Sequence, residues 1–340
     1  MKKSIFWEHV VTPETLREHK AEVVLRCQGA VIGTTGGYSY LRGKEGTRKT
    51  FLVSCMITAM LTQGEALCFS GRMPPNKDKV LYVDTEQSYY YIERVYNRIA
   101  KMSHNEGTIP NLIYVDARML DKEELLKGMR DMLEDEEGIG YMVIDSAADL
   151  VDNVNEPTEN KHVFRRLLPS LCEEFGIHAT IVLHENKGNT DGLGFADTFS
   201  KKGCESSARA IAADDGDYSI YSFKDGKLRS AKKVDDFYFY IDDDGIPAEG
   251  KSADGLPITP VTYKSTKREI PLRQHLKAMN IVFSGGEDIT TYNDLVNRFH
   301  EAYTLIGEKC GVVAIKNYIS MLRTEDFFTF YDGKYSLISY

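Results

Sequence analysis

The pattern of hydrophobic and polar positions divides the chain into two parts. From about residue 30 to residue 245, short apolar, β-branched or aromatic runs alternate with longer stretches of helical period, which is typical of a parallel sheet with crossover helices. The expected strands are Tyr38–Leu41, Val80–Asp84, Asn111–Asp116, Tyr141–Asp145 and Ala179–His184, and the expected helices lie near 49–63, 88–102, 121–134 and 159–175. Because the strand runs are apolar throughout, we expect helices on both faces of the sheet.

After residue 215 the pattern changes to strand, turn, strand. Tyr218–Phe223, an Asp225-Gly226 turn and Phe237–Ile241 predict a hairpin that extends the same sheet in antiparallel fashion. Residues 242–262 are rich in Asp, Gly and Pro, and a basic stretch follows from Lys264 to Lys277. Two predicted helices and a hairpin follow, which is the order of elements in a winged helix. The predicted parts are an N-terminal extension at 1–29, an α/β domain at 30–245, a linker with a basic stretch at 246–285, and a small winged-helix-like domain at 286–340.

Composition narrows the class of protein. A chain of 340 residues with 42% hydrophobic and 27% charged residues can bury two cores. Its six cysteines contain no C-x-x-C pair, so neither disulfides nor a zinc site is expected. No apolar run approaches a membrane span and no signal-peptide core is present, so we expect a cytoplasmic protein without membrane contact. The net charge of -9 argues against a surface that is basic throughout, but residues 251–340 carry 11 basic against 10 acidic residues, which favours DNA contact there.

The strongest chemical signal is a glycine-containing loop between a strand and a helix. Gly43–Thr50 reads Gly-Lys-Glu-Gly-Thr-Arg-Lys-Thr, directly before an apolar helix that starts near Phe51. In a phosphate-binding loop, backbone amides converge on the phosphates, the lysine reaches the β- and γ-phosphates, and the hydroxyl holds Mg²⁺. The predicted nucleotide-binding residues are Gly43, Gly46, Thr47, Arg48, Lys49, Thr50 and Phe51. Arg48 departs from the pattern, which has glycine there; a plain glycine-rich turn is the alternative.

Three more strand ends carry groups suited to nucleotide chemistry. Asp145 closes an apolar strand and is placed to orient Mg²⁺ together with Thr50. Glu86 follows the strand Val80–Asp84 and is a candidate general base toward the attacking water. His184 ends another strand and is a candidate contact to the γ-phosphate. Each also has a structural explanation, as a turn former, a helix N-terminal carboxylate or a core histidine, but their combination favours a nucleotide site.

These motifs resemble those of RecA-like P-loop ATPases, within them the hexameric replicative-helicase branch, and most closely RepA-like, AAA_25-type proteins of plasmids and mobile elements. The likeness covers about residues 30–245 and rests on five stretches: Ile32–Thr34, Gly43–Thr50, Leu81–Ser88, Ile144–Ser146 and Leu183–Lys187. It implies ATP and Mg²⁺ as ligands, hydrolysis at the subunit interfaces of a ring or filament, and single-stranded DNA as a partner of the core. At Gly192–Thr198, relatives carry a more regular loop that faces the DNA, from which this chain departs.

Two basic clusters complete the candidate sites. Arg229, Lys232 and Lys233 lie where this branch places cations that act in trans on a neighbour's γ-phosphate, although basic residues also protect a sheet edge. In the C-terminal domain, Lys309, Lys316 and Arg323 flank the apolar stripe of the second helix and are candidate DNA contacts, although winged helices also bind proteins.

The sequence therefore favours an oligomeric ATPase that couples ATP hydrolysis to DNA unwinding, translocation or remodelling in replication or mobilisation of a plasmid or mobile element. The alternative is an ATP-binding switch or adaptor protein with little turnover. A filament-forming recombination mediator would share the active site and differ in its assembly.

Overall fold

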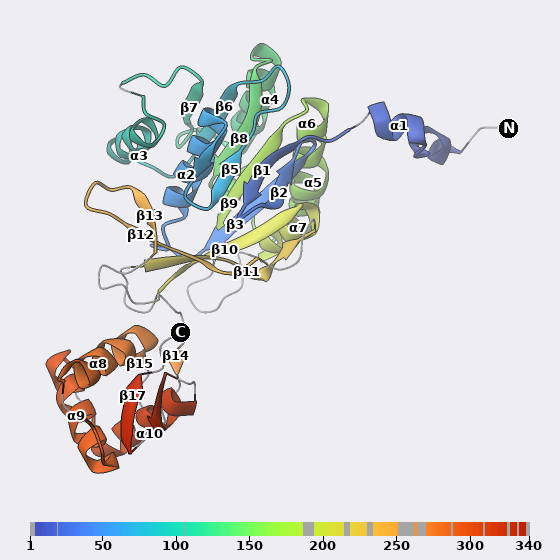
Figure 1. Cartoon of the computed structure of the whole chain (residues 1–340). Helices are drawn as coiled ribbons and strands as arrows, with labels where there is room; N and C mark the ends of the chain where they lie inside the picture. Colours follow the sequence, from blue (N-terminus) through green and yellow to red (C-terminus); the bar gives the residue numbers. More distant parts are fainter. Residues whose placement is uncertain are drawn as a thin grey trace. The chain divides into compact units, whose positions relative to one another are not determined.

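The structure is a computed structural model. It describes residues 4–18, 20–105, 107–185, 194–213, 218–229, 234–250, 262–263, 270–286, 288–308, 310–324, 327–331 and 333–337. The chain forms two compact units, the first from Met1–Ala212 with Ser219–Glu249 and the second from Ala213–Tyr218 with Gly250–Tyr340 (Figure 1). None of the described helices combines the length and apolar character that a membrane span needs.

A nine-stranded sheet, ordered β13-β12-β11-β10-β3-β9-β8-β6-β7, forms the centre of the first unit. Its strands are β3 (Gly37–Gly43), β6 (Lys79–Asp84), β7 (Leu112–Asp116), β8 (Ile139–Asp145), β9 (His178–His184), β10 (Ser206–Ala212), β11 (Tyr218–Leu228), β12 (Phe237–Ile241) and β13 (Pro247–Glu249). The strands from β10 to β7 pair in parallel, and β11 pairs antiparallel with β10. The predicted α/β class, a mostly parallel sheet with an antiparallel extension, is confirmed.

Helices cover both faces of this sheet, as the continuously apolar strands require (Figure 1). They are α2 (Lys49–Thr62), α3 (Tyr89–Met102), α4 (Lys122–Asp135), η2 (Ala147–Leu150), α5 (Pro157–His162), η3 (Val163–Leu167), α6 (Leu168–Glu174) and α7 (Gly194–Gly203). Helices α2 and α3 pack on one face, whereas α4, η3, α6 and α7 pack on the other. Asp121 and Glu124 form a capping box that fixes the start of α4.

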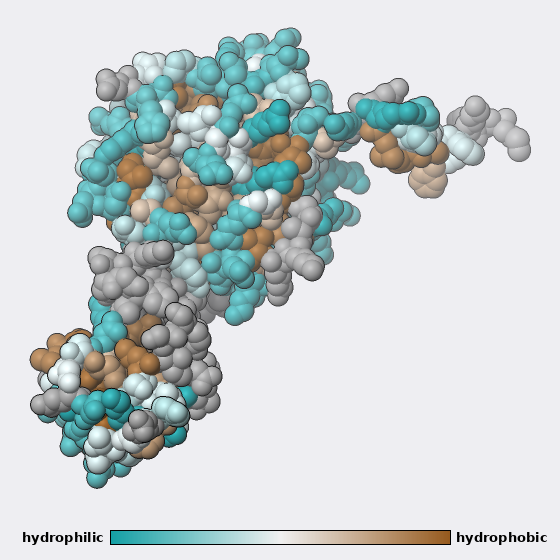
Figure 2. All heavy atoms as spheres, viewed as in Figure 1, coloured by the Kyte–Doolittle hydropathy of each residue, from teal (hydrophilic) through white to brown (hydrophobic). Residues whose placement is uncertain are grey.

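Helix α2 is apolar around most of its circumference because a second, four-stranded sheet covers its outer side. This sheet, ordered β2-β1-β5-β4, contains β1 (Val23–Cys27), β2 (Ala30–Thr34), β4 (Glu65–Ala66) and β5 (Phe69–Gly71). The predicted extension at 1–29 is therefore not separate throughout, since β1 belongs to the first unit. Ahead of it lie η1 (Ile5–His9) and α1 (Pro13–Glu18), whose segment shows hydrophobic side chains at its surface (Figure 2).

The predicted turn at Asp225-Gly226 is wrong. Strand β11 continues through both residues to Leu228, with Lys227 opposite Ser207 of β10. The register shifts between Ser207 and Arg209, and a Cβ at residue 226 would lie 1.9 Å from the carbonyl oxygen of Ser207. Gly226 therefore permits a close approach of two strands at an irregularity, rather than a hairpin turn.

The second unit contains three helices followed by a hairpin. Its elements are β14 (Thr262–Tyr263), β15 (Ile270–Pro271), α8 (Leu272–Ser284), α9 (Tyr292–Leu305), α10 (Val312–Thr324), β16 (Phe328–Tyr331) and β17 (Lys334–Leu337). Helix α8 lies inside the predicted linker 246–285, yet Leu276, Met279 and Val282 belong to the core of this unit. The predicted linker is therefore wrong at its C-terminal end, where α8 lies. The basic residues around α8 made this amphipathic helix resemble a linker in the sequence. The order of α9, α10 and the hairpin is that of a winged helix.

Candidate functional site

The loop between β3 and α2 has the backbone that phosphate binding needs. Gly46 and Arg48 adopt left-handed conformations, with φ of 76° and 63°. Glycine occupies this conformation without steric cost, which explains why the motif prefers it at position 48. Arg48 nevertheless adopts the conformation, and its Nη1 donates to Ser219 Oγ of β11 at 3.0 Å. Its side chain therefore helps to form the cavity wall.

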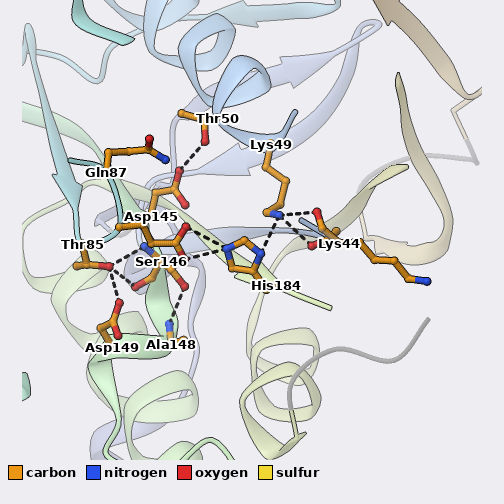
Figure 3. Close-up of polar contacts among 12 residues, drawn as sticks. Lys44, Lys49, Thr50, Thr85, Gln87, Asp145, Ser146, Ala148, Asp149 and His184 are labelled. Carbon is orange, nitrogen blue, oxygen red and sulfur yellow. Dashed lines mark hydrogen bonds and ion pairs between the residues drawn. The ribbon is translucent and has the colours of Figure 1, made fainter. Parts of the chain in front are cut away.

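Lys49, the first residue of α2, points back over the loop. Its Nζ donates to the carbonyl oxygens of Gly43 and Lys44, both at 2.9 Å, and lies 3.2 Å from Nδ1 of His184 (Figure 3). Burial lowers the pKa of Lys49, against the opposing effect of the Asp145 and Glu86 carboxylates. The Lys49 ammonium thus binds two carbonyl oxygens of the loop, which phosphate oxygens could replace.

Asp145 closes β8 and is almost fully buried beside the loop. Its Oδ2 accepts a hydrogen bond from Thr50 Oγ1 at 3.4 Å (Figure 3). It also accepts from Tyr82 Oη at 3.3 Å. Burial raises the pKa of Asp145 to about 7, and the charges of Glu86 and Asp84 act in the same direction. A nearby cation would stabilise the ionised form of this buried carboxylate.

Glu86 is positioned by the end of β6. Asp84 Oδ1 accepts from the backbone nitrogens of Glu86 and Gln87 at 3.0 and 2.9 Å, and Tyr114 Oη donates to Asp84 Oδ2 at 2.6 Å. The carboxylate oxygens of Glu86 lie 2.8 and 3.0 Å from Nε2 of His184. Burial acts to raise the pKa of Glu86, but the hydrogen bond from His184 and the charge of Lys49 outweigh it, so this pKa is lowered. Glu86 is thus ionised at neutral pH.

His184 lies between the two charged groups. Because an ammonium can only donate and a carboxylate can only accept, Nδ1 of a neutral imidazole accepts from Lys49 and Nε2–H donates to Glu86. Thr85 adds a tie between β6 and β8, since its Oγ1 accepts from the backbone nitrogen of Ser146 at 2.9 Å. The ends of three neighbouring strands therefore form one connected polar network.

A cavity of about 540 Å³ opens beside this network. Its lining includes Glu45, Gly46, Arg48, Lys49, Thr50, Phe51, Glu86, Gln87, Tyr91, Arg94, Val95, Arg98, Asp145, His184, Ile241 and Gly245. The cavity wall formed by α3 was not predicted from the sequence, although Tyr91, Arg94 or Val95, and Arg98 recur at helical spacing. The Arg98 guanidinium lies 3.6 Å from the ring centroid of Phe51, and Nε of Arg98 donates to the Gly245 carbonyl at 3.2 Å.

The remaining predicted residues lie in different places. Thr47 is buried with its Oγ1 bonded to the Lys44 carbonyl at 2.8 Å, and Gly43 contributes its carbonyl to Lys49. Arg229 is exposed just past β11 and does not line the cavity. Lys316 and Arg323 are exposed on α10. Lys232, Lys233 and Lys309 lie outside the described residues.

The stretch Gly192–Thr198, whose sequence departs from the DNA-facing loop of relatives, is helical where it is described. Residues 194–198 begin helix α7, which packs against η3. Asp197 is buried and accepts from Tyr40 Oη at 2.7 Å, which anchors the helix to β3. Residues 192–193 lie outside the described part of the chain.

The donor set fits a nucleotide with Mg²⁺. The Thr50 hydroxyl and the Asp145 carboxylate are oxygen ligands of the type that Mg²⁺ prefers, and Mg²⁺ takes its other ligands from phosphates and water. Among the described residues, no group of three or more His, Cys, Asp or Glu side chains forms a metal cage. A site of this kind is expected to bind the ion together with a nucleotide rather than alone.

Comparison with known proteins finds a family match and a similar solved structure. Residues 27–190 match the AAA_25 family, which is described as an AAA domain. Among solved structures, the chain is similar to the crystal structure of the RadB recombinase, with 16% sequence identity and a TM-score of 0.45 over 64% of this chain and 92% of that one. No curated protein sequence matches the chain. The AAA_25 match includes the loop and all three strand ends.

Proposed function

We propose that this chain is an oligomeric ATPase that couples ATP hydrolysis to unwinding, translocation or remodelling of DNA during replication or mobilisation of a plasmid or mobile element. One observation carries the ATPase assignment. Lys49, Glu86, Asp145 and His184, which come from four places in the sequence, all line one cavity at the glycine-containing loop.

The chemistry of each residue follows from its contacts. Lys49 exchanges the Gly43 and Lys44 carbonyls for phosphate oxygens of ATP, which carry more charge. Glu86, ionised at neutral pH, accepts a proton from the attacking water. Thr50 and Asp145 would hold Mg²⁺, which neutralises phosphate charge when bound. When Lys49 moves to the phosphates, Nδ1 of His184 loses this donor; with a proton taken up from solvent, Nδ1 donates to the γ-phosphate, and His184 thereby senses whether ATP is intact.

Oligomerisation and DNA binding extend the proposal. A cation from a neighbouring subunit would complete the site, and Arg229, which is exposed and does not line its own cavity, is the candidate among the described residues. Lys316 and Arg323 give α10 a basic exposed face for DNA.

A second candidate is an ATP-binding switch or adaptor protein with little turnover. It is favoured by Arg48, which places a side chain and a hydrogen bond to Ser219 at a position where the motif has no side chain. This arrangement would restrict motion of the loop between the steps of a catalytic cycle.

Phosphate release with and without single-stranded DNA separates the two candidates. The ATPase is supported by turnover that DNA stimulates and that Lys49→Ala abolishes, with Lys101→Ala on the exposed side of α3 as the charge-matched control. Tight ATP binding without turnover would support the switch. Calorimetry with Mg²⁺ and adenine nucleotides that registers no binding would refute both.

A further inference from the structure

A buried ion cluster directly follows His184. The side chain of Glu185 is 1% exposed and lies between Arg42 of β3 and Arg209 of β10. Nε and Nη2 of Arg209 donate to Oε1 and Oε2 of Glu185 at 2.6 and 2.8 Å, and Nη1 of Arg42 lies 3.2 Å from Oε1. The carboxylate is therefore held by a bidentate pair and a second guanidinium.

The cluster depends on the strand order. Strands β10, β3 and β9 are neighbours, with Arg209 opposite Arg42 and Arg42 opposite Leu183. Both arginines also reach β11, since Arg209 Nη1 lies 3.2 Å from Asp225 Oδ2 and Arg42 Nη2 donates to the Asp225 carbonyl at 3.2 Å. The Glu185 carboxylate thereby joins the end of β9 to β3 and β10, and the two arginines extend the cluster to β11.

Glu185 is also tied to the phosphate-binding loop. Its backbone nitrogen donates to the Gly43 carbonyl at 3.1 Å, and the same oxygen accepts from Nζ of Lys49 at 2.9 Å. The peptide that follows His184 is thus fixed through both its backbone and its side chain. A buried ion pair alone is weak evidence for added stability, because desolvation offsets its Coulomb energy. Because Glu185 directly follows His184 in the chain, the ion cluster also fixes the backbone beside this histidine.

We infer that Glu185, clamped by Arg42 and Arg209, is a positioning residue that holds the imidazole of His184 between Lys49 and Glu86. The inference rests on the proposed ATPase function. A small displacement of His184 would separate Nε2 from Glu86 and Nδ1 from Lys49, and groups that act in the transition state lose most of their effect when they are misplaced by about 1 Å.

Glu185→Gln tests the inference, because it keeps the size of the side chain and removes its charge. We expect kcat per nucleotide-binding site to fall by at least about tenfold, with KM for ATP changing much less. In a His184→Ala background the same substitution should have no further effect on kcat, since Glu185 acts through His184. The matched control is Glu205→Gln, in the same unit, where the carboxylate accepts from the Thr34 nitrogen at 2.8 Å, away from the cavity; its kcat should equal that of the wild type.

The outcomes are distinct. Wild-type kcat in Glu185→Gln, or the same loss with and without His184, would overturn the positioning role while leaving the ATPase intact. An absence of turnover in the wild-type protein would instead refute the proposed function and, with it, this inference. If Glu185→Gln fails to fold, Arg209→Lys serves in its place, because it keeps the charge and removes the bidentate geometry; it should show the same dependence on His184.

Discussion

Nε2 of His184 lies 2.8 Å from Oε1 of Glu86, although 98 positions separate the two residues in the sequence. They meet because β9 and β6 lie on either side of β8 in the sheet and all three strands are parallel, so that their carboxyl ends face the same side. The contact keeps Glu86 ionised and orients it toward the loop. Because the two residues are in contact, the effects of replacing both are not expected to be additive.

Replacing Glu86 by glutamine should abolish hydrolysis and preserve nucleotide binding. The amide cannot take a proton from water, and loss of a general base lowers kcat by at least about 100-fold. Phosphate release measures the rate, and calorimetry with a non-hydrolysable ATP analogue measures affinity. Glu93→Gln, on the exposed side of α3, is the matched control and should retain the wild-type rate. Equal rates in Glu86→Gln and the wild type would remove this residue from the mechanism.

Much of the site could be predicted because its signals are local. The loop reads directly from Gly43 to Thr50, and the strands that end at Asp84, Asp145 and His184 are apolar runs that each stop at a polar group. Parallel pairing brings such ends to one edge of a sheet, so no contact had to be known in advance. Their arrangement around one cavity follows from the strand order, which a single sequence does not specify.

Other features depend on contacts between distant segments. Glu185 reads as an ordinary charged residue after a strand, and only the adjacency of β3, β9 and β10 gives it two arginine partners. Gly226 has the sequence signature of a hairpin turn, but its role is a close approach to Ser207. Helix α8 had a usable signal in Leu276, Met279 and Val282, which recur every three residues, but the surrounding basic residues favoured a linker interpretation.

Arg48 should tolerate glycine better than alanine. Its φ of 63° is costly for any residue with a Cβ; both substitutions lose the bond to Ser219, but glycine removes the backbone cost whereas alanine keeps it. We expect Arg48→Gly to be more stable than Arg48→Ala by about 1 kcal/mol in denaturant unfolding. Ser219→Ala isolates the lost hydrogen bond. If the alanine variant matches or exceeds the glycine variant in stability, backbone strain at this position does not matter.

The stability of the second unit should decrease in mild acid. His275 on α8 is fully buried beside Tyr303 and Tyr318, and burial lowers its pKa to about 4. Between about pH 6.5 and pH 4 the unfolded state binds this proton more readily than the folded state, so the free energy of unfolding falls as the pH decreases, by up to roughly 3 kcal/mol.

Denaturant unfolding between pH 7 and pH 4.5, followed by hydrogen exchange in peptides from α9 and α10, measures this effect. His275→Gln should flatten the pH dependence because its side chain does not titrate in this range. His300→Gln, at an exposed position of α9, should leave the pH dependence as it is in the wild type. A slope that persists in His275→Gln would assign the acid sensitivity to other groups.

DNA binding by the second unit should depend on the exposed face of α10. Lys316 and Arg323 are seven residues apart, which places them on one side of the helix about 10 Å from each other. If both contact phosphates, each alanine substitution should weaken binding and reduce the slope of log affinity against log salt by about 0.9 for duplex DNA, because one fewer counterion is released. Fluorescence anisotropy over a salt series measures both quantities. Arg298→Ala is the charge-matched control, because Arg298 is paired with Asp294 on α9.

Unchanged slopes would exclude phosphate contacts by Lys316 and Arg323. That result would favour a protein partner on α10, where Val313 is 76% exposed.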